Sequence, residues 1–291
     1  MPKPEWLAIR PASTEKYNDV KNRIKELGLH TVCVEAHCPN ITECWSSGTA
    51  TFMVLGDVCT RGCHFCAVSK ARSGISVDRM EPDKLARVIR EWKLDYVVIT
   101  SVCRDDLDDQ GSSHFAECIR AIKRDAPSTM VEVLIPDFRS DIDALKKIVD
   151  ARPDVVGHNI ETVRRLSPSV RDRRASYDNS LSVLWKVKAL DKRIYTKSAM
   201  MLGMGESDDE IMESMRDLRE RGVDFLAIGQ YLRPMSSGFY AEVKEYVTPE
   251  RFEALRKMAM ELGFKYCAAG PFVRSSYKAG EHFIKAMIKE R

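Results

Sequence analysis

The chain has 291 residues, of which 44% are hydrophobic, and its formal net charge at pH 7 is +3. This is enough apolar material for the core of one large domain. The small net charge gives no general attraction to nucleic acid, and no stretch approaches the roughly 18 apolar residues that a membrane helix needs. The N-terminus lacks the apolar run of a signal peptide. We therefore expect a soluble, cytoplasmic protein with neither a nucleic-acid nor a membrane partner.

The apolar pattern predicts alternating strands and helices along most of the chain. Six short segments, many rich in β-branched residues, are typical of strands buried on both faces, at 51–56, 96–101, 130–135, 155–160, 195–200 and 225–230. Helical patterns with Pro, Ser or acidic starts lie between or after them, at 83–92, 112–124, 141–149, 208–221 and 249–262. Repeated strand–helix alternation predicts a parallel sheet with right-handed crossovers.

Two α/β architectures fit this alternation: an open doubly wound sheet, and a complete or partial (β/α) barrel. In both, functional groups lie at the C-terminal ends of the strands. Residues 1–50 precede the first expected strand, and residues 264–291 follow the last expected helix. These flanks are expected to lie against the barrel or to cap one of its ends.

Cysteine carries most of the functional signal in this sequence. The chain has nine cysteines, and six of them lie between positions 33 and 66. An odd number without a signal sequence does not suit a secreted disulfide framework. In a reducing compartment, clustered cysteines more often bind metal or do chemistry.

Directly after the first expected strand, Cys59, Cys63 and Cys66 form a C-x3-C-x2-C motif. A four-iron cluster normally takes four ligands, so three thiolates leave one iron open to a substrate or cofactor. Gly62 lets the loop wrap closely around such a cluster. The alternatives are three incidental cysteines, or a zinc site completed by His64, which is badly placed beside Cys63.

With Phe65 before its third cysteine, this motif resembles the signature of the radical S-adenosylmethionine superfamily. The resemblance implies that Cys59, Cys63 and Cys66 hold a 4Fe–4S cluster whose open iron binds S-adenosylmethionine. One-electron reduction then cleaves this cofactor to methionine and a 5′-deoxyadenosyl radical, which abstracts hydrogen from unactivated carbon.

Further residues near the ends of the fourth and fifth expected strands are candidates for binding the cofactor. Two polar residues after the fourth strand can reach the ribose or methionine part of the cofactor. A lysine near the end of the fifth strand is unlikely to be buried without a partner. The segment after the fifth strand resembles the superfamily's glycine-containing cofactor segment. The candidates are Asn159, Glu161, Lys197, Gly203, Gly205 and Glu206. Past the second strand, Arg104 or Asp105 can orient the cofactor, or belong to a solvated loop.

Upstream, Cys33, Cys38 and Cys44 form a second triad with C-x4-C-x5-C spacing. Because these cysteines precede the barrel, they can fold over its open end. The alternatives are buried thiols without a metal, or a structural zinc completed by His37.

The second triad, together with segments spread from about residue 4 to 279, resembles the lipoyl synthase family. The matching segments are at 45, 48–57, 100–107, 131–138, 158–163, 196–198, 228–232 and 270–277. The resemblance implies a partial (β/α)6 TIM-type barrel at 51–263. It also implies an N-terminal extension at 1–50 with the second triad, and a C-terminal extension at 264–291.

The resemblance also implies an activity and partners. In that family an auxiliary 4Fe–4S cluster, held here by the upstream triad and a serine (Ser276 rather than Ser275), donates sulfur. Two sulfur atoms enter at C6 and C8 of an octanoyl group on a carrier lysine. The expected partners are an octanoylated lipoyl carrier domain or a glycine-cleavage H-type protein, a ferredoxin or flavodoxin reductant, and an iron–sulfur carrier that rebuilds the cluster.

Rival functions within and outside the superfamily fit less well. A methylthiotransferase-like enzyme usually has a larger N-terminal domain and a C-terminal RNA-binding module, and a biotin-synthase-like enzyme has second-cluster ligands inside the barrel strands. A non-catalytic iron–sulfur electron carrier or a zinc-stabilised binding module needs closed sites with four ligands.

Two further groups of residues have less certain roles. A basic stretch suits either a solvated face or docking of an acidic carrier domain, at Arg164, Arg165, Arg171, Arg173 and Arg174. Of the cysteines without ligand spacing, Cys118 is expected in the core, and Cys103 and Cys267 have no assigned role.

Overall fold

The computed structural model describes residues 2–8, 15–46, 50–276 and 287–288. The chain divides into two compact units. The N-terminal unit comprises Arg10–Arg61 and Ala67–Val156. The C-terminal unit comprises Met1–Ile9, Gly62–Cys66 and Gly157–Arg291. The boundary between them lies inside one short strand, β7 (Val155–Gly157).

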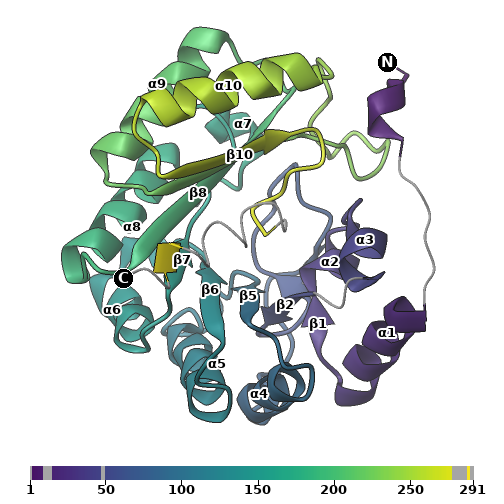
Figure 1. The fold of residues 1–291 in the computed structure, drawn as a ribbon, viewed down its shortest axis with the longest axis vertical. Helices are drawn as coiled ribbons and strands as arrows, with labels where there is room; N and C mark the ends of the chain where they lie inside the picture. Colours follow the sequence, from purple (N-terminus) through teal and green to yellow (C-terminus); the bar gives the residue numbers. More distant parts are fainter. Residues whose placement is uncertain (1, 9–14, 47–49, 277–286, 289–291) are drawn as a thin grey trace. The chain divides into compact units, whose positions relative to one another are not determined.

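The N-terminal unit contains strands in the order β1-β2-β5-β6 (Figure 1). The short β1 (His30–Thr31) pairs antiparallel with β2 (Thr51–Val54), and β5 (Tyr96–Ser101) and β6 (Met130–Leu134) continue in parallel. Helices α4 (Glu81–Glu91), α5 (Ser112–Asp125) and α6 (Ile142–Asp150) lie side by side, next to one another in Figure 1. The remaining helices are α1 (Glu15–Leu27), α2 (Val32–Glu35), α3 (Ile41–Ser46) and η2 (Phe138–Ser140).

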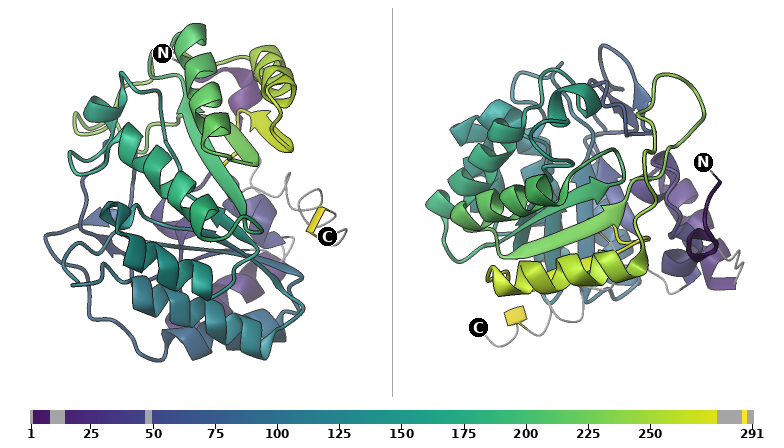
Figure 2. Two further views of the ribbon diagram at one scale, coloured as in Figure 1. Left: turned by 90° about the vertical axis from the view of Figure 1, so that its left-hand side faces the viewer. Right: turned by 90° about the horizontal axis from the view of Figure 1, so that it is seen from above.

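The C-terminal unit contains the parallel strands β8 (Tyr195–Leu202), β9 (Phe225–Gln230) and β10 (Tyr266–Gly270). Its helices are η1 (Glu5–Leu7), α7 (Ser167–Val170), α8 (Tyr177–Leu190), α9 (Asp208–Glu220) and α10 (Pro249–Glu261). Figure 2 shows α10 lying along the strands, and α10 contacts β10. Apolar side chains from these helices and strands form one core, which includes Leu184, Met215, Ile228 and Phe252.

The expected α/β fold with a mostly parallel sheet is confirmed. All six expected strands are present, and the bounds of β5 and β9 agree with the prediction to the residue. Every residue of β9 is buried, as is all of β5 except its last residue, which explains why their composition is apolar throughout. Helices α4, α5, α6, α9 and α10 lie where the helical patterns predicted them.

Several predicted bounds differ from the structure by one residue or more, and three of these differences have local structural features beside them. Strand β2 ends at Val54 instead of 56, because Leu55 (φ +69°) and Gly56 (φ +85°) leave the extended conformation. Strand β7 ends at Gly157 instead of 160, and Glu161 forms an isolated bridge to Met200. Helix α6 begins one residue later than expected, because the carboxylate of Asp141 caps it by accepting a hydrogen bond from Asp143 N.

Several elements were not predicted, among them helices α1 and α3 in the expected N-terminal extension. Helix α8 (Tyr177–Leu190) fills the region between the fourth and fifth expected strands, and Ser176 caps it. Strand β10 lies in the expected C-terminal extension and adds a parallel strand beside β9. The three-part division at residues 50 and 263 stays a prediction. Within the described residues, no helix combines the length and the apolar character that crossing a membrane requires.

The start of α9 generates a test of the local energetics. Ser207 Oγ accepts a hydrogen bond from Glu210 N (3.3 Å), and Ser207 N donates to Glu210 Oε2 (2.9 Å). Because Ser207→Ala removes one half of this capping box, we expect it to lower the free energy of unfolding by about 1 kcal/mol. Urea titration followed by circular dichroism measures the change. The exposed loop substitution Ser236→Ala is the control, and equal stability of both variants would contradict the assignment.

Candidate functional site

The Cys59–Cys66 segment is a loop whose first residue is fixed by backbone pairing. Cys59 ends β3 (Val58–Cys59), which pairs in parallel with β4 (Ser69–Lys70), and Ala71 N donates to Cys59 O at 3.1 Å. Cys59, Cys63 and Cys66 are all partly exposed. The three thiols therefore lie on a short, anchored loop within reach of solvent.

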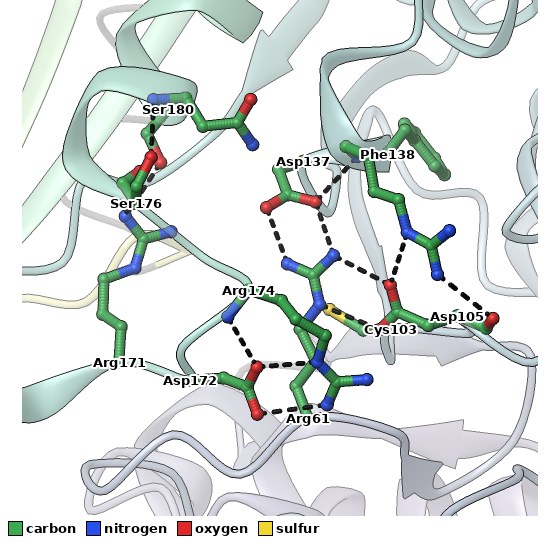
Figure 3. Close-up of polar contacts among 12 residues, drawn as sticks. Arg61, Cys103, Asp105, Asp137, Phe138, Arg171, Asp172, Arg174, Ser176 and Ser180 are labelled. Atoms are coloured by element: carbon green, nitrogen blue, oxygen red, sulfur yellow. Dashed lines mark hydrogen bonds and ion pairs between the residues drawn. The ribbon is translucent and has the colours of Figure 1, made fainter. Parts of the chain in front are cut away.

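The first part of this loop is held by buried polar contacts in the N-terminal unit. Arg61 donates to Asp137 through both terminal nitrogens (2.6 and 2.7 Å) and to Asp105 through Nε (2.9 Å), as Figure 3 shows. Thr60 Oγ1 donates to Asp105 Oδ2 and to Cys103 O, both at 2.9 Å. Arg61 and Asp137 are almost fully buried. Paired charge-assisted hydrogen bonds of this kind fix backbone position strongly, and breaking such a buried pair costs about 3–5 kcal/mol.

These surroundings favour the thiolate form of Cys59. A hydrogen bond from the Cys103 side chain lowers the pKa of Cys59 to about 6, and the Arg61 backbone N–H, 3.4 Å from Sγ, acts in the same direction. The same contact and burial raise the pKa of Cys103, so Cys103 keeps its proton as the donor. The thiolate is the form that binds metal, so this donor set fits an iron–sulfur cluster.

Residues 62–66 are held by the C-terminal unit. Gly62 N donates to Asp172 Oδ2 (2.7 Å), and Asp172 N donates to Cys63 Sγ (3.3 Å). His64 N donates to Val170 O (2.8 Å). The guanidinium of Arg174 holds the pKa of Asp172 well below its usual range, so this carboxylate is charged.

The aromatic residue before the third cysteine packs into a small apolar cluster. Phe65 contacts the cluster formed by Val170, Met204 and Tyr231. The His64 ring lies edge-on to Phe239, with ring centroids 4.9 Å apart. Phe65 therefore anchors the loop through packing.

The second triad lies on two short helices and the turn between them. Cys33 belongs to α2 and Cys44 to α3, and Cys38 N donates to Cys33 O at 3.0 Å. Burial raises the pKa of Cys33 to about 11, so without a metal this thiol is protonated. Cys33, Cys38 and Cys44 therefore lie within one continuous folded segment of the chain.

The spacing of the second triad does not favour the zinc alternative. Thiolates around one tetrahedral zinc ion, at about 2.3 Å from the metal, lie about 3.8 Å apart. Among the described residues, the groups of three whose ligand atoms lie within 4.8 Å of one another are elsewhere, at Glu81, His114 and Cys118 and at His30, Glu35 and Asp57. A four-iron cluster holds its thiolates farther apart than a single ion does.

Two of the predicted cofactor residues lie together after β7. Asn159 Nδ2 donates to Glu161 Oε1 (3.2 Å), and Ser275 Oγ donates to Asn159 Oδ1 (3.0 Å). Glu161 has a φ of +68° and is fixed by backbone hydrogen bonds to Ala199 O and from Met201 N. Burial raises the pKa of Glu161. These contacts link the end of β7 to the serine pair that was predicted as a cluster ligand.

Lys197 and Ser276 are two further residues of the predicted site. Lys197 is buried on β8, and its carbonyl oxygen accepts from His158 N. Ser276 is partly buried and directly follows Ser275. The roles of both residues stay predictions, as does the choice between the two serines.

The predicted glycine segment after β8 is held by contacts within the protein. Glu206 accepts hydrogen bonds from Gly203 N (2.9 Å) and Met204 N (3.0 Å), so its carboxylate stabilises its own turn. A Cβ on Gly203 would lie 2.2 Å from Gln230 Nε2 and 2.4 Å from Glu245 O. Close packing therefore explains Gly203 without a ligand, while Gly205, with a φ of +105°, has more open surroundings.

Three of the five arginines in the basic stretch form ion pairs within the C-terminal unit. Arg164 pairs with Asp178 and Asp217, Arg165 with Glu210, and Arg174 with Asp172. Arg171 is buried and donates to Ser180 Oγ (2.9 Å) and Ser176 O (3.1 Å), as Figure 3 shows. These intramolecular contacts favour a structural role over the docking of an acidic partner.

Sequence reasoning missed several residues that hold the cysteine loop. Asp137 follows β6, a position where functional groups of parallel sheets gather, so its location was an available signal. Asp172 had no comparable signal. Arg104 pairs with Asp106 (2.9 Å), whereas Asp105 binds Arg61. Cys118 is confirmed as core, and Cys267 is buried on β10.

The packing of Gly203 gives a test. Gly203→Ala places a methyl group against two polar atoms and requires a φ of +104°. We expect overpacking alone to lower the free energy of unfolding by about 1–3 kcal/mol. Gly238→Ala is the matched control, because no atom lies within 4 Å of its added Cβ. Denaturant unfolding of both variants measures the difference, and a neutral Gly203→Ala would refute the packing account.

Comparisons with known proteins show the family to which the chain belongs. The sequence model of the Radical SAM superfamily matches residues 53–218. The chain is 53% identical to the lipoyl synthase of Methanocella arvoryzae over 290 residues, covering 100% of this chain and 97% of that protein. It is 54% identical to the lipoyl synthase of Halobacterium salinarum, covering 99% and 93%. It is 47% identical to the apicoplast lipoyl synthase of Plasmodium falciparum, covering 99% and 69%.

Solved structures show the fold. A methylornithine synthase is similar with a TM-score of 0.55 and 13% identity, covering 96% of this chain and 93% of that one. A maturase of the FeFe-hydrogenase gives a TM-score of 0.57 and 12% identity, covering 88% and 62%. Because a relative that is more than half identical spans the whole chain, the chain belongs to the lipoyl synthase family of the Radical SAM superfamily.

Proposed function

We propose that this chain acts as a lipoyl synthase, a sulfurtransferase that inserts sulfur at C6 and C8 of a protein-bound octanoyl-lysine by radical chemistry. The observation that carries the proposal is the pair of three-cysteine segments in a chain that is 53% identical, over its whole length, to a lipoyl synthase. The redox chemistry belongs to the bound groups, and the protein supplies binding, orientation and electrostatics.

Cys59, Cys63 and Cys66 are proposed to hold the cluster that binds S-adenosylmethionine. When bound, this 4Fe–4S cluster supplies the electron that cleaves S-adenosylmethionine and thereby generates the 5′-deoxyadenosyl radical. The chain's own task is to present three thiolates on one loop and leave the fourth position open. The contacts of Arg61 with Asp105 and Asp137 support this, because they anchor the loop beside Cys59.

Six residues are proposed to form the S-adenosylmethionine site, three by contacting the cofactor and three by shaping a neighbouring turn. The carboxylate and amide of Glu161 and Asn159 offer acceptors for the amino group and ribose hydroxyls, and the Lys197 ammonium suits the methionine carboxylate. The other three, Gly203, Gly205 and Glu206, shape the turn after β8. The hydrogen bond from Asn159 to Glu161 supports a shared role for this pair.

The auxiliary 4Fe–4S cluster is proposed as the sulfur-donating substrate, held by Cys33, Cys38, Cys44 and Ser276. A serine alkoxide is a harder ligand than a thiolate and suits a cluster that must be taken apart. Because burial raises the pKa of Cys33, cluster binding must release its proton, so assembly is favoured at higher pH.

The proposed partners follow from this chemistry. The substrate is an octanoylated lipoyl carrier domain or a glycine-cleavage H-type protein. The electron donor is a ferredoxin or flavodoxin, and an iron–sulfur carrier rebuilds the consumed cluster. Such chemistry requires a reducing compartment, for which we propose the cytoplasm.

The function is tested with the reconstituted, dithionite-reduced protein under argon. Given S-adenosylmethionine and an octanoyl-lysine peptide, we expect the peptide to gain two sulfur atoms as the reduced dithiol, as measured by mass spectrometry. Exposure of the product to air afterwards should close the disulfide ring and remove two hydrogen atoms. An unchanged peptide in the presence of 5′-deoxyadenosine would refute the substrate while leaving the radical chemistry in place.

The auxiliary cluster is tested separately by Cys38→Ala. Because Cys38 is not among the proposed ligands of the first cluster, this variant should still form 5′-deoxyadenosine but no lipoyl group. Cys267→Ala, which changes a cysteine outside both triads, is the control and should retain both products. Normal lipoyl formation by Cys38→Ala would exclude the proposed auxiliary site.

A further inference from the structure

Asp172 contacts two consecutive residues of the cysteine loop, one through its side chain and the other through its backbone. Its side-chain Oδ2 accepts a hydrogen bond from Gly62 N at 2.7 Å, and its backbone N–H donates to Cys63 Sγ at 3.3 Å. All three residues belong to the C-terminal unit. Asp172 lies just after α7, far along the chain from the cysteines. One residue therefore orients the backbone before Cys63 and also contacts the sulfur of Cys63.

Asp172 is itself held in place. Arg174 donates to Oδ1 through Nε (2.8 Å) and to Oδ2 through a terminal nitrogen (3.1 Å), and Arg174 N donates to Oδ1 (3.0 Å), as drawn in Figure 3. The Asp172 side chain is 10% exposed. A partly buried carboxylate with four donors keeps one orientation, so both contacts to the loop are pre-set.

Both contacts bear on an iron–sulfur cluster. An N–H group that donates to a ligand sulfur stabilises the more negatively charged, reduced cluster and so raises its reduction potential. The Gly62 contact restrains the loop between the first two cysteines, and an ordered loop retains its cluster better than a mobile one. The negative charge of Asp172 acts against reduction, but the guanidinium of Arg174 offsets it.

We propose that Asp172 is a positioning residue for the cluster held by Cys59, Cys63 and Cys66, and that it sets both the retention and the reduction potential of that cluster. The inference rests on the proposed assignment of these cysteines. The competing explanation is that Asp172 only pairs with Arg174 to shape the turn after α7.

A pair of neutral variants separates these explanations. Asp172→Asn keeps an oxygen that can accept from Gly62 N, and Asp172→Ala does not. Both remove the same charge, so a difference between them reports the hydrogen bond and the loop geometry, and not the loss of charge. Asp178→Ala is the control, because it removes another arginine-paired aspartate, the partner of Arg164, from the same unit.

The readout is the part of the EPR signal of the reduced holoenzyme that changes when S-adenosylmethionine is added. We expect Asp172→Ala to lose this signal several-fold faster than the unchanged protein under an iron chelator, and to show a lower midpoint potential than Asp172→Asn. Asp172→Asn should retain the cluster nearly as well as the unchanged protein, and Asp178→Ala fully.

The outcomes distinguish a failure of the role of Asp172 from a failure of the proposed cluster assignment. Equal chelation rates and equal potentials for the alanine and asparagine variants would overturn the role of Asp172. An unchanged protein without any signal sensitive to S-adenosylmethionine would overturn the cluster assignment instead. If Asp172→Ala does not fold, Asp172→Ser takes its place, because the shorter serine side chain does not reach Gly62 N.

Discussion

The buried pairing of Arg61 with Asp105 and Asp137 is the interaction on which the cysteine loop depends. Three thiolates can leave an iron open only if the backbone between them keeps one conformation. The guanidinium has two carboxylate partners at 2.6–2.9 Å, deep in the N-terminal unit, and follows Cys59 by two residues. Removing one partner from such a buried network costs about 3–5 kcal/mol, because it leaves an uncompensated buried charge.

Acidic residues follow parallel strands in each of the two units. Asp105 follows β5 and Asp137 follows β6 in the N-terminal unit, and Glu206 follows β8 in the C-terminal unit. Within one sheet, the carboxyl ends of parallel strands form the edge where active sites of α/β folds are built. Their present contacts differ, because Asp137 holds an arginine, whereas Glu206 binds the N–H groups of its own turn. A carboxylate at such a position therefore either pairs with a distant side chain or stabilises its own turn.

The sequence predicted the fold where burial was uniform and missed it where pairing depends on distant segments. Strands β5 and β9 were predicted to the residue because nearly all of their side chains are buried. Strand β10 has a weaker pattern, with three partly exposed residues, and only its pairing with β9 defines it. The cysteines were visible as spacing, but the Asp172 contact joins residues 110 positions apart and has no local signature. The basic stretch suggested a solvated face or a docking surface, yet Arg164 and Arg165 pair with Asp217 and Glu210, which lie far along the chain and have no local signature.

The central claim is that the loop from Cys59 to Cys66 holds a cluster that cleaves S-adenosylmethionine. The most direct measurement is 5′-deoxyadenosine formed by the reduced, reconstituted protein without any acyl substrate, compared with the same preparation of Cys63→Ala. We expect the nucleoside from the unchanged chain and none above background from the variant. Equal amounts from both proteins would show that this loop does not hold the cluster, and would contradict the account.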